Sequence, residues 1–208
     1  MANRPVFVAN NNQFYQHFLD FTWHTGLSTA QKQKSVAELH TVFNSIYPDL
    51  KVLEVSSKST EELGRNLSAF SLQNEDGFLV ETIFQGSKVF TEGGPYVDLY
   101  EETPIKAKRD KRLTSSGSLI GFNYKGIEFP INPETLFYDW LYIKALVVNK
   151  ELAEEVLKYS AFTDIEFNPK KSLNCQAQAL SIYVALVGAG LLEQALSSVD
   201  SFREIVYI

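Results

Sequence analysis

Cysteine, histidine and long apolar runs are scarce in this chain of 208 residues. The single cysteine, Cys175, excludes an intramolecular disulfide, so nothing in the sequence indicates an oxidising compartment. The three histidines, His17, His24 and His40, lack metal-ligand spacing to the cysteine or to a pair of carboxylates. We therefore expect neither a metal nor a cofactor.

Sequence features of membrane and secreted proteins are also missing. The most apolar stretch, residues 179 to 192, is too short to span a bilayer and is interrupted by Gly188 and Gly190. No apolar run near the N-terminus is long enough for a signal peptide. Since no heptad pattern or long apolar stripe requires association, we expect a cytoplasmic monomer that does not enter a membrane.

Familiar nucleotide and hydrolase motifs are absent as well. The sequence contains no G-x-x-x-x-G-K-[ST], no G-x-G-x-x-G and no G-x-S-x-G. It therefore gives no motif support to a triphosphate-binding site, a dinucleotide-binding site or a serine hydrolase. Cys175 lies just inside an apolar helical pattern, which favours a buried small side chain over a nucleophile.

The chain has enough apolar residues for a full core, because 45% are hydrophobic and 13% aromatic. Its patterns predict an α+β fold that is mainly helical, with a small β-hairpin. We expect an N-terminal extension over residues 1–50 and a main domain over 51–208, forming one compact unit. The predicted helices cover residues 29–46, 80–90, 134–149, 150–159 and 172–192, and the predicted strands cover 52–55, 119–124, 127–131 and 202–207.

Three polar side chains recur at helical spacing in the central segment. Glu81, Gln85 and Lys88 are spaced i, i+4 and i+7, so on a helix they lie within one narrow sector. Apolar neighbours indicate a buried helix, where the pKa values of an acid and an amine move toward neutrality. The segment therefore suits proton transfer or chemistry by an amine, although a solvated surface helix has the same spacing.

One strongly basic run stands out against the net charge of −6, which argues against a general nucleic-acid coat. Five cations lie within seven residues and are opposed there only by Asp110. The run fits a phosphate-binding site and fits a solvated helix or loop equally well. Its cations are Lys106, Lys108, Arg109, Lys111 and Arg112.

The central segment, Val80-Glu81-x-x-Phe84-Gln85-x-x-Lys88-x-Phe90, resembles the E-H-x-F-Q-x-x-K-F helix of the NADAR family. Other segments follow in the family's order: 67–70 resembles F-S-N-F, 107–112 resembles A-x-x-x-G-R, and 172–174 resembles the start of G-x-N-x-L-G. The chain departs from the common pattern at Thr82, where histidine is usual, and at 164–167, which replace W-G-D-G.

Within the family, longer segments resemble those of the NADAR antitoxins encoded beside DarT-type DNA ADP-ribosyltransferase toxins. These segments lie at residues 53–59, 84–90, 93–99 and 137–142, and the resemblance extends from Trp23 to Leu186. It implies an N-glycosidase-type hydrolase in a NADAR-like domain over 51–208. The implied substrate is DNA with ADP-ribose on guanine, and the implied partners are ADP-ribose and the cognate toxin.

The resemblance and the chemistry of the bond suggest roles for the polar residues. Glu81 is the candidate acid and base, and Lys88 stabilises the departing group or attacks as an amine that forms an imine. Lys34 and Lys58 are further candidates for that amine. The expected substrate-binding residues are Lys58, Ser68, Gln85, Gly94, Tyr96, Asp98, Arg109, Arg112, Asp139 and Trp140.

The binding residues have separate expected tasks. Gln85 orients Glu81 or a ribose hydroxyl, and the loop at Gly94 and Tyr96 lets backbone amides approach the ligand. Asp98 and Asp139 are expected to hold ribose hydroxyls, with Trp140 as a sugar platform. Arg109 and Arg112 are expected to bind phosphate, since guanidinium groups bind its oxygens in pairs. For Asp139 and Trp140, packing on a helix face is the alternative.

Two other functions remain open from the sequence. One is hydrolysis of a small ribosylamino metabolite of the riboflavin pathway, as in other NADAR enzymes, although the long segment before Val52 is unlike the compact members. The other is an antitoxin without enzymatic activity that binds the toxin or the modified DNA, for which an acidic surface suits a basic partner.

Overall fold

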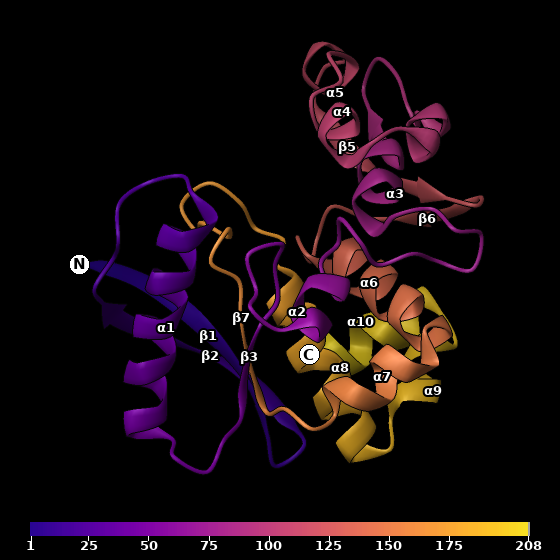
Figure 1. Cartoon of the computed structure of the whole chain (residues 1–208). Helices are drawn as coiled ribbons and strands as arrows, with labels where there is room; N and C mark the ends of the chain where they lie inside the picture. Colours follow the sequence, from indigo (N-terminus) through magenta and orange to yellow (C-terminus); the bar gives the residue numbers. More distant parts are fainter. Residues whose placement is uncertain (208) are drawn as a thin grey trace. The chain divides into compact units, whose positions relative to one another are not determined.

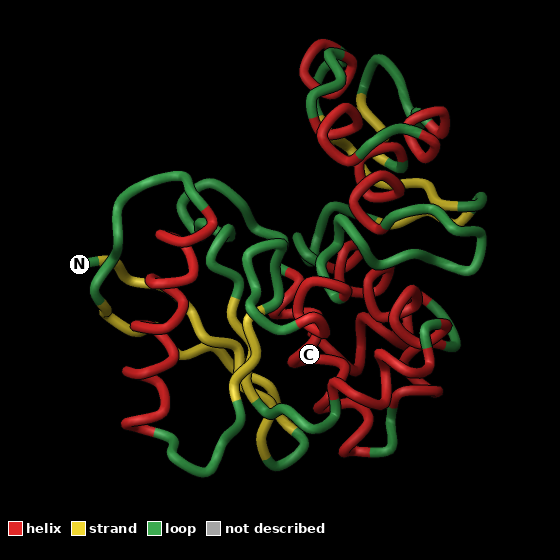
Figure 2. The backbone as a smooth tube through the Cα atoms, in the orientation of Figure 1, coloured by secondary structure: helices red, strands yellow, loops and turns green. Residues whose placement is uncertain are grey.

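The computed structural model describes residues 1–207 and is mixed α and β, as the sequence predicted. Its contacts divide the chain into two compact units. The first unit comprises residues 1–68 and 150–193, and the second comprises 69–149 together with the residues from 194 onward. Each unit has its own sheet, and Figure 2 shows the strands of each sheet among its helices.

The first unit contains a four-stranded sheet in the order β2-β1-β7-β3. β1 (Ala2–Asn10) and β2 (Gln13–Phe21) form a long antiparallel hairpin, in which Asn10 pairs with Gln13. β7 (Ala161–Thr163) joins β1 in antiparallel orientation and β3 (Val52–Glu54) in parallel orientation. The sheet thereby brings residues 52–54 next to 161–163, which are far apart in the sequence.

Helices cover both faces of this sheet. Along β1, Val6 and Val8 pack with Leu39 and Phe43 of α1 (Thr29–Ile46) in one core cluster. Successive side chains of a strand point to opposite faces, so the buried Phe7 faces the other side, where α8 (Gln176–Ala189) contacts β1. Figure 1 shows α1 and α8 on opposite sides of the strands. The other helices of this unit are α2 (Glu62–Asn66) and α7 (Lys150–Val156).

The second unit contains a three-stranded antiparallel sheet in the order β4-β5-β6. β4 (Lys88–Phe90) pairs with β5 (Leu119–Tyr124), and β6 (Ile127–Phe129) follows β5 through a turn at Lys125 and Gly126. Both turn residues have positive φ, at 52° and 82°. This geometry is that of a two-residue hairpin turn, so the hairpin predicted from the sequence is confirmed.

Aromatic rings fill the core of the second unit. Phe137 of α6 (Leu136–Val148) lies 4.8 Å from Phe122 and 4.7 Å from Phe129, measured between ring centroids. Phe84 of α3 (Val80–Gly86) lies 5.5 Å from the Phe122 ring. The sheet, α3 and α6 therefore share one core.

The remaining elements of the second unit are η1 (Val97–Glu101), α4 (Pro104–Lys108), α5 (Arg112–Ser115) and α10 (Val199–Tyr207). Helix α9 (Leu192–Leu196) spans the sequence boundary between the units.

The predicted helix at 29–46 is confirmed with both of its ends. Its N-terminal cap is Ser28, whose hydroxyl accepts a hydrogen bond from the Gln31 backbone N–H. The predictions at 134–149, 150–159 and 172–192 correspond to α6, α7 and α8, although α8 begins at Gln176 rather than at Ser172. The strand predicted at 52–55 is β3.

Two predictions of secondary structure are wrong. The central helix stops at Gly86, and Lys88 starts β4 instead of a third helical turn, because Val89 and Phe90 pair with β5. The segment predicted as a strand at 202–207 is part of α10, whose buried Phe202 and Val206 are four residues apart and so share one helix face. The β1–β2 hairpin was not predicted, although its strands flank the Asn11-Asn12 turn, whose residues have positive φ of 50° and 61°. Among residues 1–207, no helix combines the length and apolar character needed to cross a bilayer.

Candidate functional site

Glu81 lies in the first turn of α3 and is only 6% exposed. Its backbone N–H donates to the Ala69 carbonyl, which fixes the start of the helix beside the segment before it. A carboxylate at this end of a helix is favoured by the helix dipole. Glu81 is therefore a buried acid with a fixed backbone.

Gln85 joins Glu81 to Lys88. Its Nε2 donates to Glu81 Oε1 at 2.8 Å, and its Oε1 accepts from Lys88 Nζ at 2.6 Å. The amide therefore has one orientation that satisfies both neighbours. The predicted meeting of these three side chains is present, although Lys88 reaches it from a strand.

The Lys88 amine is partly buried and lies 5.0 Å from the centroid of the Phe84 ring. Burial lowers the pKa of Lys88, the Glu81 charge raises it, and the nearby Lys108 charge lowers it further. A lowered pKa increases the fraction of neutral amine, which is the nucleophilic form.

Lys108, at the end of α4, brings a second cation to Glu81. Its Nζ lies 3.6 Å from Glu81 Oε1, and its side chain is 59% exposed while that of Glu81 is 8% exposed. Glu81 Oε1 is thus shared by Gln85 and Lys108, whereas Oε2 accepts no hydrogen bond from residues 1–207. This second oxygen is placed to exchange a proton with a ligand.

The loop after β4 packs back onto that strand. Gly94 has φ +88°, and a Cβ at this position would lie 2.2 Å from the Lys88 carbonyl oxygen, so only glycine fits. Tyr96 hydrogen-bonds through its hydroxyl to Ser116, and its backbone N–H donates to the Gly86 carbonyl. The loop therefore supports the backbone on both sides of Ser87.

Asp98 and Arg112 are bound to each other on the surface of this loop. The Arg112 guanidinium donates to both Asp98 oxygens, at 3.1 and 2.6 Å, and also to Asp110. Hydrogen bonds from Arg112 lower the pKa of Asp98, and its guanidinium lies 4.5 Å from the Tyr96 ring centroid. Both side chains are engaged within the protein, while Arg109 is exposed. The contact of Asp98 with ribose and the contacts of Arg109 and Arg112 with phosphate stay predictions.

Asp139 and Trp140 lie in the core of the second unit. Asp139 is fully buried and accepts a hydrogen bond from the Tyr207 hydroxyl at 2.7 Å. Trp140 is 6% exposed, with its ring 5.0 Å from Phe129, and it lines a cavity of about 200 Å³ with Asn74, Tyr124 and Lys144. Both residues therefore help to pack this unit, and their contact with a sugar stays a prediction.

The other three predicted site residues belong to the first unit. Lys34 is exposed on α1, and Ser68 is buried at the end of this unit's first segment. Lys58 is partly buried in the turn after β3, and its backbone N–H donates to the Ser56 hydroxyl at 3.1 Å. Among residues 1–207, the Lys58 amine forms no hydrogen bond or ion pair, so the turn presents it without a charged partner.

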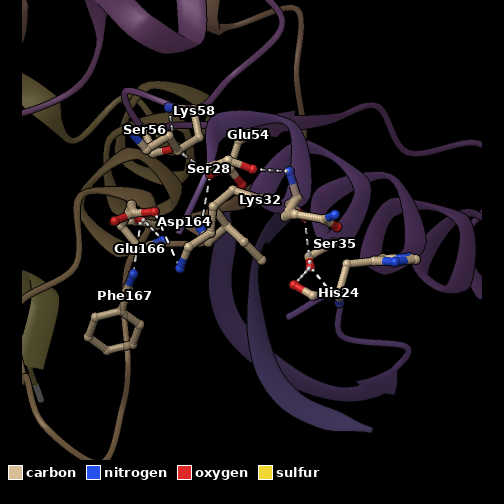
Figure 3. A network of polar contacts seen from close by, with 12 residues as sticks. His24, Ser28, Lys32, Ser35, Glu54, Ser56, Lys58, Asp164, Glu166 and Phe167 are labelled. Atoms are coloured by element: carbon tan, nitrogen blue, oxygen red, sulfur yellow. Dashed lines mark hydrogen bonds and ion pairs between the residues drawn. The ribbon is translucent and has the colours of Figure 1, made fainter. Parts of the chain in front are cut away.

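A buried carboxylate, Glu54, anchors the turn that carries Lys58 (Figure 3). Glu54 accepts hydrogen bonds from the Ser56 hydroxyl at 2.6 Å, the Thr163 hydroxyl at 2.6 Å and the Ile165 backbone at 2.9 Å. Burial raises the pKa of Glu54 to about 7, and the three hydrogen bonds lower it in part. The donors on this carboxylate are therefore all neutral.

Two further titratable residues surround Glu54. His40 Nε2 lies 2.8 Å from the Thr163 hydroxyl, and burial lowers the pKa of His40 to about 4, which keeps the ring neutral. Because Thr163 donates its single proton to Glu54, His40 Nε2 is the donor to Thr163. Asp164 accepts from the Glu166 and Phe167 backbone, and burial followed by the charge of Glu54 raises its pKa.

The sequence comparison assigns a family. The model of the DarT1-associated NADAR antitoxin family matches residues 2–208. The chain belongs to this family. No curated protein matches the chain in a sequence search. Within residues 1–207, no cluster of three or more histidine, cysteine, aspartate or glutamate side chains could hold a metal ion in this NADAR chain.

Two contacts of this NADAR antitoxin were not predicted from the sequence. Lys108 appeared only as one of five cations, and α4 is the element that directs it toward Glu81. Glu54 was not singled out, because its partners Thr163 and Ile165 lie more than a hundred positions away. An acidic residue inside the apolar strand 52–55 was the available sign of a buried carboxylate.

Proposed function

We propose that this antitoxin hydrolyses the N-glycosidic bond between ADP-ribose and a guanine base of DNA and so reverses a DarT-type toxin. Family membership supports the antitoxin role and the toxin partner. The observation that carries the chemistry is the chain of contacts from the exposed Lys108 through the buried Glu81 and Gln85 to the partly buried Lys88. A carboxylate and an amine held this way provide the acid, base and positive charge that such a reaction needs.

In the proposed reaction, Glu81 handles the protons. Water adds to the anomeric carbon of the ribose attached to guanine, the bond from that carbon to the guanine nitrogen breaks, and the nitrogen takes a proton. Glu81 Oε2, which is not bound by Gln85 or Lys108, exchanges the proton. The products are free ADP-ribose and unmodified guanine in the DNA.

Lys88 has two roles that fit its environment. As a cation, it stabilises negative charge on the departing base. As a neutral amine, which its lowered pKa favours, it attacks the anomeric carbon of the opened ribose. The bond from that carbon to the guanine nitrogen breaks, the nitrogen leaves with a proton, and water then cleaves the resulting imine to ADP-ribose and the free amine. Lys58 and Lys34 are alternative amines for the second role. Trapping with a hydride reductant distinguishes them, because it links the sugar to the lysine that forms the imine.

Release of ADP-ribose from a guanine-modified DNA oligonucleotide is the test. We expect wild-type protein to restore the bare oligonucleotide, with Glu81→Gln and Lys88→Met slower by roughly 100-fold or more. Glu102→Gln and Lys106→Met are matched controls, because these residues form an exposed ion pair with each other. Gel shift and mass spectrometry follow the reaction, and circular dichroism confirms that each variant is folded.

The same variants separate the proposal from an antitoxin that only binds. If wild-type protein leaves the modified DNA intact, the proposed hydrolysis is wrong. If Glu81→Gln still protects cells against the toxin, protection does not depend on the carboxylate, and binding is the better explanation. A hydrolase instead loses both release of ADP-ribose and protection in this variant.

A further inference from the structure

We propose that Lys108 binds a phosphate group of the substrate, exchanging its ion pair with Glu81 for a contact with the ligand. This inference rests on the proposed function and deepens it, because it names a residue that selects phosphate-bearing substrates. The phosphate belongs to the pyrophosphate of ADP-ribose or to the DNA backbone, which offer the same charged oxygens.

The two side chains of the ion pair differ in exposure. The Lys108 side chain is 59% exposed and Glu81 only 8%, so a ligand in solvent reaches the amine before it reaches the carboxylate. Ala107, the preceding residue, is fully buried and its backbone N–H donates to the Thr103 carbonyl. The backbone of Lys108 is thus anchored while its side chain extends into solvent beside the acid.

The contact between Lys108 and Glu81 is long. The two charged atoms are 3.6 Å apart, beyond the roughly 2.7–2.9 Å of a charge-assisted hydrogen bond between an amine and a carboxylate. A phosphate offers several oxygens and forms short charge-assisted hydrogen bonds with an amine. Exchange of Glu81 for a phosphate therefore replaces a long contact of the Lys108 amine by a short one. It also removes one of the two groups now bound to Glu81 Oε1, which frees that oxygen for the substrate.

Two other cations of the basic run, Lys106 and Arg112, have partners that differ from that of Lys108. Lys106 pairs with Glu102, one turn earlier on the same helix. Arg112 is held by Asp98 and Asp110 and has its charge neutralised there. Lys108 is the member of the run whose partner is the proposed acid. It also lies 5.7 Å from the ring centroid of Phe70, whose side chain is partly exposed next to it.

The experiment compares Lys108→Met with Lys106→Met on three substrates. The first is the ADP-ribosylated oligonucleotide, the second is the same oligonucleotide trimmed to leave ribose alone on guanine, and the third is ADP-ribosyl-guanosine without DNA. On the first substrate we expect Lys108→Met to raise KM about tenfold with little change in kcat. Lys106→Met should stay within about twofold of wild type, and Lys108→Arg should restore a low KM because it keeps the charge.

The other two substrates identify the phosphate. If Lys108 binds the pyrophosphate, the higher KM of Lys108→Met persists on ADP-ribosyl-guanosine and disappears on the trimmed oligonucleotide. If Lys108 binds the DNA backbone, the higher KM persists on the trimmed oligonucleotide and disappears on ADP-ribosyl-guanosine. The inference is overturned if Lys108→Met matches wild type on every substrate, or if Lys106→Met shows the same defect.

Binding of ADP-ribose and of unmodified oligonucleotide by calorimetry keeps the inference separate from the proposed function. If wild-type protein hydrolyses none of the substrates, the proposed function fails, and these affinities then decide about Lys108. A selective loss of affinity for either ligand in Lys108→Met supports the phosphate contact. Equal affinities for both ligands in wild type, Lys108→Met and Lys106→Met contradict it.

Discussion

Each of the two units buries a glutamate to a similar degree but surrounds it differently. Glu54 in the first unit is 3% exposed and Glu81 in the second is 6% exposed. Hydroxyl groups and a backbone N–H use both oxygens of Glu54. A lysine and an amide share one oxygen of Glu81, and its other oxygen accepts nothing from the described residues 1–207.

The difference shows how partners give buried carboxylates separate tasks. Three neutral donors hold Glu54 in one position and tie β3 to β7 and to the Lys58 turn, which suits a structural role. Glu81 keeps unused acceptor capacity beside two amines, which suits exchange of protons with a ligand. Burial alone would not separate the two residues.

The largest effect is expected from substitution of Glu81, on the rate of the proposed hydrolysis. Glu81→Gln should lower single-turnover release of ADP-ribose by roughly 10²- to 10⁴-fold, because an amide cannot transfer the proton. Its midpoint in urea should remain near that of wild type. A Glu81→Gln protein that cleaves at the wild-type rate would show that this carboxylate is not the acid.

Substitution of Gly64 should cause the largest loss of stability. A Cβ at this buried glycine would lie 2.0 Å from the Glu54 carbonyl oxygen and 2.4 Å from the Ser59 hydroxyl. Gly64→Ala should therefore lower the free energy of unfolding by about 1–3 kcal/mol. Urea denaturation measures this change. Glu62→Ala, at an exposed position of the same helix, is the control and should have a smaller effect.

The pH dependence of stability should report on Glu54. Its pKa is raised to about 7 in the folded protein, so the folded state binds the proton more tightly than the unfolded chain. Stability should therefore fall as pH rises from about 4.5 to 7, by on the order of a few kcal/mol. Glu54→Gln removes this group and should flatten the profile, although Asp164 contributes in the same direction.

Thr163→Val is the matched control for Glu54. It removes the hydroxyl between Glu54 and His40 but leaves the carboxylate able to titrate. We expect it to lower the free energy of unfolding by about 1–3 kcal/mol at neutral pH and to keep the slope. Urea denaturation at pH 5 and pH 8 measures both variants. A Glu54→Gln profile as steep as that of wild type would contradict the assignment.

The smallest effect is expected at an exposed carboxylate. Arg112→Lys replaces the two hydrogen bonds to Asp98 by at most one, at a pair in contact with solvent. We expect a change below about 1 kcal/mol that shrinks further in high salt. Melting temperatures at low and high salt measure it. A large loss that salt does not reduce would show that this pair is more than a surface contact.

Local patterns predicted the parts of the fold that depend on neighbours in sequence. The cap and apolar spacing of α1 and the Lys125-Gly126 turn were sufficient for those two elements. The β1–β2 hairpin is also local, since Asn10 pairs with Gln13 across the Asn11-Asn12 turn, but this turn was not recognised from the sequence. The segment of α10 was predicted as a strand because apolar spacing over six residues suits either structure. For so short a segment, tertiary packing determines whether a helix or a strand forms.

The candidate site divides in the same way. The spacing in the sequence was sufficient to predict that Glu81, Gln85 and Lys88 meet, since Glu81 and Gln85 are one helical turn apart and Lys88 follows three residues later. The position of Lys88 on a strand, the pairing of Lys108 with Glu81 and the anchoring of the Lys58 turn by Glu54 were visible in the tertiary structure alone. These contacts depend on backbone hydrogen bonds and buried surfaces between distant segments, which a local pattern does not encode.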